Sequence, residues 1–155
     1  MACRGNPLLT CRFLHGYGVS FEIWFEGELD ERNWVMDFGM AKRATNLIDG
    51  MSPKEWMDYM FDHTFIVAED DPFVESFQKM DELGAAQIRI LPSVGAERFA
   101  EYIFNKVDTF VKEETEGRVS VVRVKFMEHN KNSATYEKSS SNEKLEAVLK
   151  TLSNL

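Results

Sequence analysis

Residues 19–26 read Val-Ser-Phe-Glu-Ile-Trp-Phe-Glu, and every second side chain of this stretch is a large apolar one. A side-chain period of two is typical of a β-strand with one buried face. The face expected to be buried carries Val19, Phe21, Ile23 and Phe25. A polar, turn-rich stretch follows, and Trp34-Val35-Met36 predicts a short second strand, so the two strands are expected to form a hairpin.

Four segments after this hairpin have the spacing or the start signals of α-helices. Apolar residues recur at helical spacing over residues 38–48, where Asp37 is the expected cap, and again over residues 73–83. Ser52-Pro53 is a favourable beginning for a short helix within residues 51–60. The longest helix is expected to begin near Val94. Its apolar stripe consists of Phe99, Ala100, Ile103, Phe104, Val107, Phe110 and Val111.

The remaining apolar stretches predict further strands at residues 88–91, 119–127 and 133–136. The core side of the strand at 119–127 is expected to carry Val122, Val124 and Phe126. Residues 61–68 form a compact apolar stretch, and residues 69–72 close it as a loop in which Asp70 and Asp71 are expected to be solvated.

The predicted strands and helices do not alternate as regularly spaced β-α-β units. This order of elements therefore predicts an α+β fold, an antiparallel β-sheet with helices packed on one face. A chain of 155 residues is long enough to bury the core of one ordinary domain. That domain is expected over residues 1–137, followed by a C-terminal linker and short helix over residues 138–155.

Charge and composition exclude several classes of function. With 18 Lys and Arg against 26 Asp and Glu, the net charge of −8 argues against a nucleic-acid surface, which needs a basic stripe. No apolar run is long enough to span a membrane or to form a signal peptide, so a cytoplasmic protein is expected. Two cysteines, Cys3 and Cys11, are too few for a disulfide framework and are expected as thiols.

Side chains that could take part in catalysis or bind a metal ion lie where the predicted helices and strands begin or end. They are Cys11, His15 and Tyr17 before the first strand, Asp62 and His63 after the second helix, and Glu128 and His129 at the end of a strand. Active sites are commonly built on such loops, because a rigid scaffold holds them in place. Taken singly, each residue also fits a structural role: a cysteine as a small buried hydrophobe, a histidine as a hydrogen-bonded group.

These residues carry a resemblance to a known family. The sequence resembles the 6-pyruvoyl-tetrahydropterin synthase and 6-carboxy-tetrahydropterin synthase family over roughly residues 3 to 137. The matching segments are Cys11-x-x-x-His15-Gly16, Met36-Asp37-Phe38, Phe61-Asp62-His63, Ala96-Glu97-Arg98-Phe99-Ala100 and Val124-Lys125-Phe126-Met127-Glu128, with Tyr136 in register. Five segments in the right order make the resemblance far more specific than any one of them.

The resemblance implies a tunnelling fold (T-fold), with a four-stranded antiparallel sheet and two long helices on one side. It also implies closure into a barrel by oligomerisation, usually a homohexamer, with active sites between subunits. Cys11 would abstract a proton, Asp62 and His63 would relay protons, and Glu128 would anchor the pterin. One carboxylate that accepts two N–H donors from the edge of a flat ring orients that ring well.

The same resemblance implies a zinc ion held by histidines, and here the sequence departs from the family. His15 matches a metal ligand, but Tyr17 stands where the family has another histidine, and Cys3 is nearest to the place of the first. The predicted zinc ligands are therefore His15, Cys3 and Tyr17, with His129 as a replacement candidate. The family's first strand has no counterpart before Cys3, so either Met1 is not the natural start or the sheet lacks an edge strand.

The function implied by the resemblance is that of a lyase. It would convert 7,8-dihydroneopterin triphosphate to 6-carboxy-5,6,7,8-tetrahydropterin in 7-deazaguanine and queuosine biosynthesis. Two alternatives stay open: triphosphate elimination that gives 6-pyruvoyl-tetrahydropterin, and a non-catalytic member that binds a pterin or purine.

Overall fold

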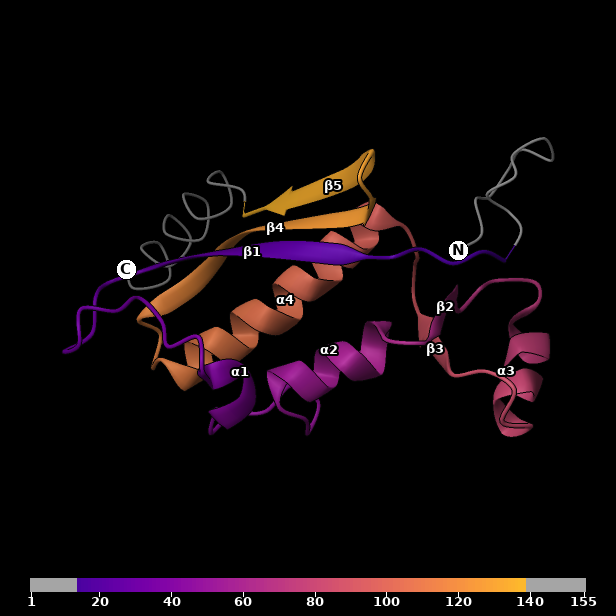
Figure 1. Ribbon diagram of the computed structural model, residues 1–155, viewed down its shortest axis with the longest axis horizontal. Helices are drawn as coiled ribbons and strands as arrows, with labels where there is room; N and C mark the ends of the chain where they lie inside the picture. The colour runs from indigo at the N-terminus through magenta and orange to yellow at the C-terminus, as the bar shows by residue number, and fades with distance from the viewer. Residues whose placement is uncertain (1–13, 139–155) are drawn as a thin grey trace, which may run out of the picture.

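The computed structural model describes residues 14–138 and contains a three-stranded antiparallel sheet in the order β1-β4-β5. Its strands are β1 (Ser20–Gly27), β4 (Val119–His129) and β5 (Asn132–Glu137). Helices α4 (Ala96–Glu114) and α2 (Pro53–Phe61) lie on the same side of this sheet (Figure 1). The predicted fold class, an antiparallel sheet with helices on one face, is confirmed.

The core lies between α4 and the sheet. All seven residues of the predicted stripe on α4 are buried. They pack against the inner face of β4, where the ring of Phe99 lies 5.1 Å from that of Phe126. Since burying one such side chain contributes about 1.5–3 kcal/mol, this layer is a main source of stability.

A β-bulge at Val122 changes which residues of β4 face the core. Trp24 pairs with Arg123 while Phe25 pairs with Val121, so Val122 has no partner on β1. Because a bulge adds one residue to one strand, the inward face passes from Val121 to Val124. The prediction that Val122 faces the core is wrong, whereas those for Val124 and Phe126 are confirmed, at 0% and 1% exposure.

The predicted hairpin between residues 19–26 and 34–36 is wrong. β1 pairs with β4, and residues 34–36 are not a strand. The guanidinium group of Arg118 donates hydrogen bonds to the backbone carbonyls of Glu28, Trp34 and Val35. These carbonyls are therefore bonded to a side chain instead of a neighbouring strand.

The helix predicted over residues 38–48 is limited to α1 (Met40–Arg43). The prediction that Asp37 is the cap is wrong: the N-cap is Gly39, and Asp37 Oδ1 accepts the backbone N–H of Gly39 at 2.7 Å, one residue before the helix. The helix stops where the Glu114 carboxylate of α4 accepts the backbone N–H groups of Thr45 and Asn46, at 3.0 and 2.8 Å. The Glu114 carboxylate thus accepts the two backbone N–H groups that carbonyls of α1 would accept if the helix continued.

This contact predicts a pH-dependent contribution to stability. Partial burial favours a higher pKa for Glu114, but hydrogen bonds from Asn46 and Thr45 outweigh it and hold the pKa below its usual value. The contribution is therefore present above the unfolded pKa of about 4.3 and is lost as the pH falls through the folded pKa. We expect Glu114→Gln to melt about 2–4 °C below the wild type at pH 7, with a smaller difference at pH 3. Thermal melts of both proteins across this range measure it, and a difference that grows on acidification contradicts it.

The middle of the chain forms a β-α-β unit that the sequence analysis only partly predicted. β2 (Phe65–Ala68) and β3 (Ile88–Leu91) pair in parallel, and α3 (Val74–Glu82) connects them. Figure 1 places this unit at one end of the molecule, beyond α2. The strand and helix at 88–91 and 73–83 are confirmed, but the parallel pairing was not foreseen, because four apolar residues do not specify a partner.

Local capping explains where α2 and α3 begin. At α2, Ser52 and Glu55 form a capping box in which each side chain accepts a backbone N–H of the other residue. Before α3, Asp71 is only 8% exposed, and its Oδ1 accepts the N–H of Phe73 at 2.9 Å. The expectation that Asp71 is solvated is wrong. Its side chain is buried, and the backbone N–H of Phe73 donates the hydrogen bond that water would otherwise supply to the carboxylate.

Among residues 14–138, no helix is long and apolar enough to cross a membrane. β5 ends at Glu137, and of the C-terminal linker and short helix predicted over residues 138–155, residues 139–155 lie outside the described residues.

Candidate functional site

One end of the sheet gathers the residues singled out by the sequence. Phe21 near the start of β1 pairs with Phe126 near the end of β4. The ring of Phe61, the last residue of α2, lies 5.8 Å from Phe21 and 6.1 Å from Phe126. The segment before β1, the segment after α2 and the end of β4 therefore meet at this end (Figure 1).

Glu128 is a buried carboxylate at this end, with 9% of its surface exposed. It lies between two paired positions, Met127 with Ser133 and His129 with Asn132, where the register shifts. A register shift of this kind can change the direction in which a side chain points. Glu128 is buried, as is Phe126 two residues earlier on the strand. Within residues 14–138, no hydrogen bond or ion pair to its carboxylate is found. No side-chain oxygen in this part of the chain is both buried and without a partner, so the carboxylate oxygens of Glu128 still reach solvent and can accept donors from a ligand, which makes Glu128 a candidate binding residue.

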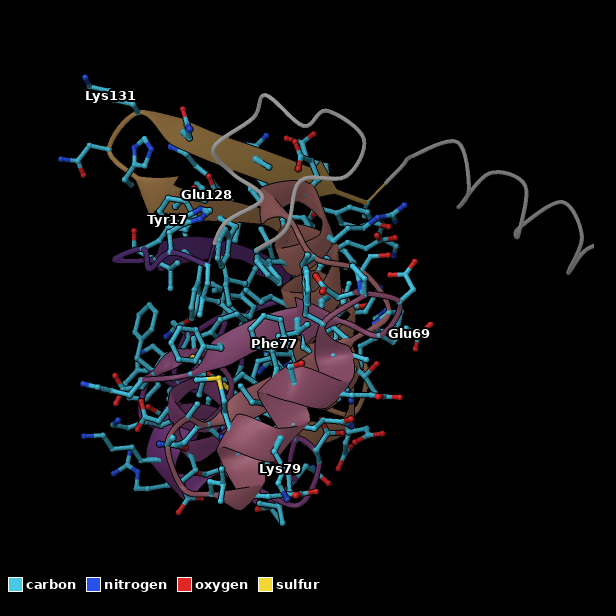
Figure 2. The ribbon with its side chains drawn as sticks, turned by 90° about the vertical axis from the view of Figure 1, so that its right-hand side faces the viewer. Tyr17, Glu69, Phe77, Lys79, Glu128 and Lys131 are labelled. Carbon is cyan, nitrogen blue, oxygen red and sulfur yellow. The ribbon has the colours of Figure 1, made fainter. Side chains whose placement is uncertain are left out.

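A cluster of imidazole and phenol groups lies at the same end of the sheet as Glu128. The hydroxyl of Tyr17 is 2.8 Å from His15 Nε2, and the two rings meet edge to face at 4.8 Å. The ring of Tyr17 also lies 6.0 Å from that of His129, the neighbour of Glu128 on β4. In Figure 2, which views the molecule from the right-hand side of Figure 1, the labelled residues Tyr17 and Glu128 appear next to one another. We call His15, Tyr17 and His129 the imidazole–phenol cluster.

Asp62 and His63 form a second polar pair, directly after α2. His63 Nδ1 lies 2.7 Å from Asp62 Oδ1, and His63 adopts a left-handed backbone conformation with φ of 54°. A carboxylate on Nδ1 favours the tautomer whose hydrogen is on that nitrogen, which leaves Nε2 as a proton acceptor. The two side chains are 68% and 86% exposed, so in the single chain this pair is open to solvent or to another molecule.

Five of the predicted site residues therefore come from segments that meet at one end of the sheet: His15, Tyr17, Asp62, His63 and Glu128. Cys3 and Cys11 lie outside the described residues. In the sequence analysis, His129 was named only as a replacement candidate for a zinc ligand. The signal for including it was its position next to Glu128. The structure adds its contact with Tyr17.

The described part of the chain does not by itself fit the predicted zinc site. Among residues 14–138, no three His, Cys, Asp or Glu side chains are grouped so that they could hold a metal ion. His15 Nε2 lies at hydrogen-bond distance, 2.8 Å, from the hydroxyl of Tyr17. Since Cys3 lies outside the described residues, the zinc set of His15, Cys3 and Tyr17 stays a prediction.

Known proteins similar to this chain point to one family. A sequence model described as 6-pyruvoyl tetrahydropterin synthase matches residues 4–139. A Rickettsia felis protein named 6-carboxy-5,6,7,8-tetrahydropterin synthase is 29% identical over 99 residues, which are 63% of this chain and 64% of that protein. A Rickettsia typhi protein of the same name is 36% identical over 62 residues, which are 39% of each. The chain thus matches less than two thirds of the length of these relatives.

The fold has a counterpart among solved structures. The crystal structure of an uncharacterized protein from Wolinella succinogenes superimposes with a TM-score of 0.69, over 86% of this chain and 84% of that one. The two sequences are 21% identical, so this likeness shows the fold alone.

Proposed function

The chain belongs to the 6-pyruvoyl tetrahydropterin synthase family, and from this membership we propose that it is a lyase acting on 7,8-dihydroneopterin triphosphate. The proposed product is 6-carboxy-5,6,7,8-tetrahydropterin, the compound in the names of its Rickettsia relatives. That product would serve 7-deazaguanine and queuosine synthesis. Triphosphate elimination to 6-pyruvoyl-tetrahydropterin is the alternative that the family name supports.

The single observation that carries the proposal is Glu128, a residue only 9% exposed whose carboxylate has no partner within residues 14–138. A pterin presents an amino group and a ring N–H side by side on its amidine edge. A carboxylate that accepts both hydrogens forms a bidentate pair and holds the ring in one orientation. The ligand would thereby supply the partner that Glu128 does not have within residues 14–138.

Asp62 and His63 are the proposed proton-relay pair. With Asp62 on Nδ1, Nε2 of His63 can take up a proton from the substrate and return it. Cys11, outside the described residues, is the proposed proton-abstracting thiolate.

We further propose a homo-oligomer, with a hexamer as the expected assembly and active sites between subunits. Among the described residues, β1 and β5 are the two edges of the sheet and can each take another strand. A largely apolar groove of about 520 Å³ lies along β1 and is lined in part by Trp24, Trp34 and Met36. The exposed Asp62–His63 pair would be enclosed by a second subunit, and light scattering in solution measures the assembly.

Product analysis tests the reaction. We expect the full-length protein to convert 7,8-dihydroneopterin triphosphate to 6-carboxy-5,6,7,8-tetrahydropterin, detected by chromatography and mass spectrometry. His63→Ala is expected to lower kcat by about 100-fold or more, because general acid–base groups contribute that much. Ring binding should persist, since Glu128 is untouched. If the wild type and His63→Ala bind pterin with the same affinity and neither forms product, the protein is instead a non-catalytic family member that binds a pterin.

A further inference from the structure

The groove along β1 exposes large apolar side chains. It is lined by residues 23–25 of β1 and by residues 34–38, which precede α1. Three aromatic residues of this lining remain exposed: Trp24, Trp34 and Phe38. An exposed apolar surface of this kind marks a place where another segment of chain or another protein binds.

The last described residues bring the chain to the rim of this groove. The backbone N–H of Lys138 donates to the carbonyl of Val122 at 3.1 Å, so the chain stays on β4 for one residue beyond β5. Arg123 of β4 pairs with Glu137 of β5 at 2.6 Å, and its guanidinium lies 5.3 Å from the centre of the Trp24 ring. Trp24 and Lys138 line one surface depression, and Trp24 also lines the groove. This depression therefore leads from the end of β5 to the groove.

The residues beyond Lys138 have the sequence pattern of a linker followed by an amphipathic helix. We call residues 139–155 the C-terminal tail. It opens with Ser-Ser-Ser-Asn, and four apolar residues then recur at spacings of three and four: Leu145, Val148, Leu149 and Leu152. A helix places these four on one face and Ala147 on the opposite face. Because so short a helix is marginal in water by itself, its apolar face needs a surface to pack against.

The linker is long enough to reach the groove. Figure 1 shows that the end of β5 and the segment between β1 and α1 lie at the same end of the molecule. One strand separates β5 from β1, and neighbouring strands are about 4.8 Å apart, so the crossing measures about 10 Å. The four residues 139–142 span about 13–14 Å when extended.

We propose that the C-terminal tail docks into the groove of its own chain as a helix over residues 143–152. Its apolar face covers the exposed rings of Trp24, Trp34 and Phe38, and a second copy of the chain is the competing occupant. Glu128 and the subunit contact proposed at Asp62 and His63 lie toward the other end of the sheet. The docked tail therefore leaves both of them accessible.

A photo-crosslinker in the apolar stripe tests which surface the tail contacts. The full-length protein is made with benzoylphenylalanine in place of Leu149 and irradiated, and the crosslinked peptides are identified by mass spectrometry. Crosslinks are expected to residues 23–25 and 34–38. In a mixture of unlabelled and ¹⁵N-labelled protein, both peptides of each crosslink should carry the same isotope. The same group in place of Ala147 is the matched control and should give few of these crosslinks.

A charge in the stripe should release the tail from the groove. Leu149→Glu is expected to increase quenching of tryptophan fluorescence by acrylamide, because Trp24 and Trp34 lose their cover while Trp56 stays buried. The melting temperature is expected to fall by about 3–6 °C, since a leucine loses its apolar contacts. Ala147→Glu adds the same charge to the opposite face and should change neither measurement.

Three results overturn the proposal. Crosslinks that join labelled to unlabelled chains would assign the groove to a second copy. Crosslinks outside the groove, or none at all, would show that the tail does not dock there. Equal acrylamide quenching in the wild type and Leu149→Glu would mean that the tail does not cover the tryptophans.

Discussion

Glu128→Gln is expected to weaken binding of 6-methylpterin by about 100-fold or more. Each hydrogen bond to a charged group is worth about 1.5–3 kcal/mol, and two such bonds to the ring edge would be affected. Glutamine has nearly the same shape but carries an NH₂ group in place of one oxygen, and that group faces a donor of the ring. Isothermal titration calorimetry of both proteins measures the loss.

The stability of this variant separates a lost contact from a misfolded protein. Because no hydrogen bond or ion pair within residues 14–138 uses the carboxylate of Glu128, its replacement by the similarly shaped glutamine is expected to leave the melting temperature nearly unchanged. Glu22→Gln, at an exposed position on β1, is the matched control and should bind as the wild type does. An unchanged affinity of Glu128→Gln would remove Glu128 from the site.

Phe126→Ala is expected to lower the free energy of unfolding by about 3–5 kcal/mol, the usual range for a buried phenylalanine. Phe126 is 1% exposed and touches the rings of Phe61 and Phe99, so it joins α2 and α4 to the sheet. Its loss would leave a cavity shared by all three elements. Urea unfolding followed by circular dichroism measures the change.

The control for this prediction is a phenylalanine in contact with water. Phe73, before α3, is 64% exposed, and Phe73→Ala should change stability by no more than about 0.5 kcal/mol. Equal losses for the two variants would mean that Phe126 does not hold the three elements together.

The helices and strands with strong local signals could be predicted from the sequence. α4 has a seven-residue apolar stripe and α2 has its capping box, and both signals lie within one segment of chain. The pairing of β1 with β4 and the bulge at Val122 depend on residues about 100 positions apart. Periodicity within one segment cannot choose between such partners. The hydrogen bonds from Arg118 to the carbonyls of Trp34 and Val35 likewise join residues 84 and 83 positions apart.

The candidate site was found through the resemblance more than through local pattern. Asp62, His63 and Glu128 were identified because they match family motifs in order. The link from Tyr17 to His129 was not predictable, because it requires the start of β1 and the end of β4 to be neighbours in the sheet. The expected role of Tyr17 as a metal ligand stays a prediction, and what the described structure adds is its hydrogen bond to His15.

A crystal structure of the full-length protein with 6-methylpterin is the most direct test of where the ring binds. If the account holds, the two oxygens of Glu128 lie about 2.7–2.9 Å from the amino nitrogen and the adjacent ring nitrogen of the ligand. A pterin bound with its amidine edge on other groups, and with Glu128 touching no part of it, would contradict the account.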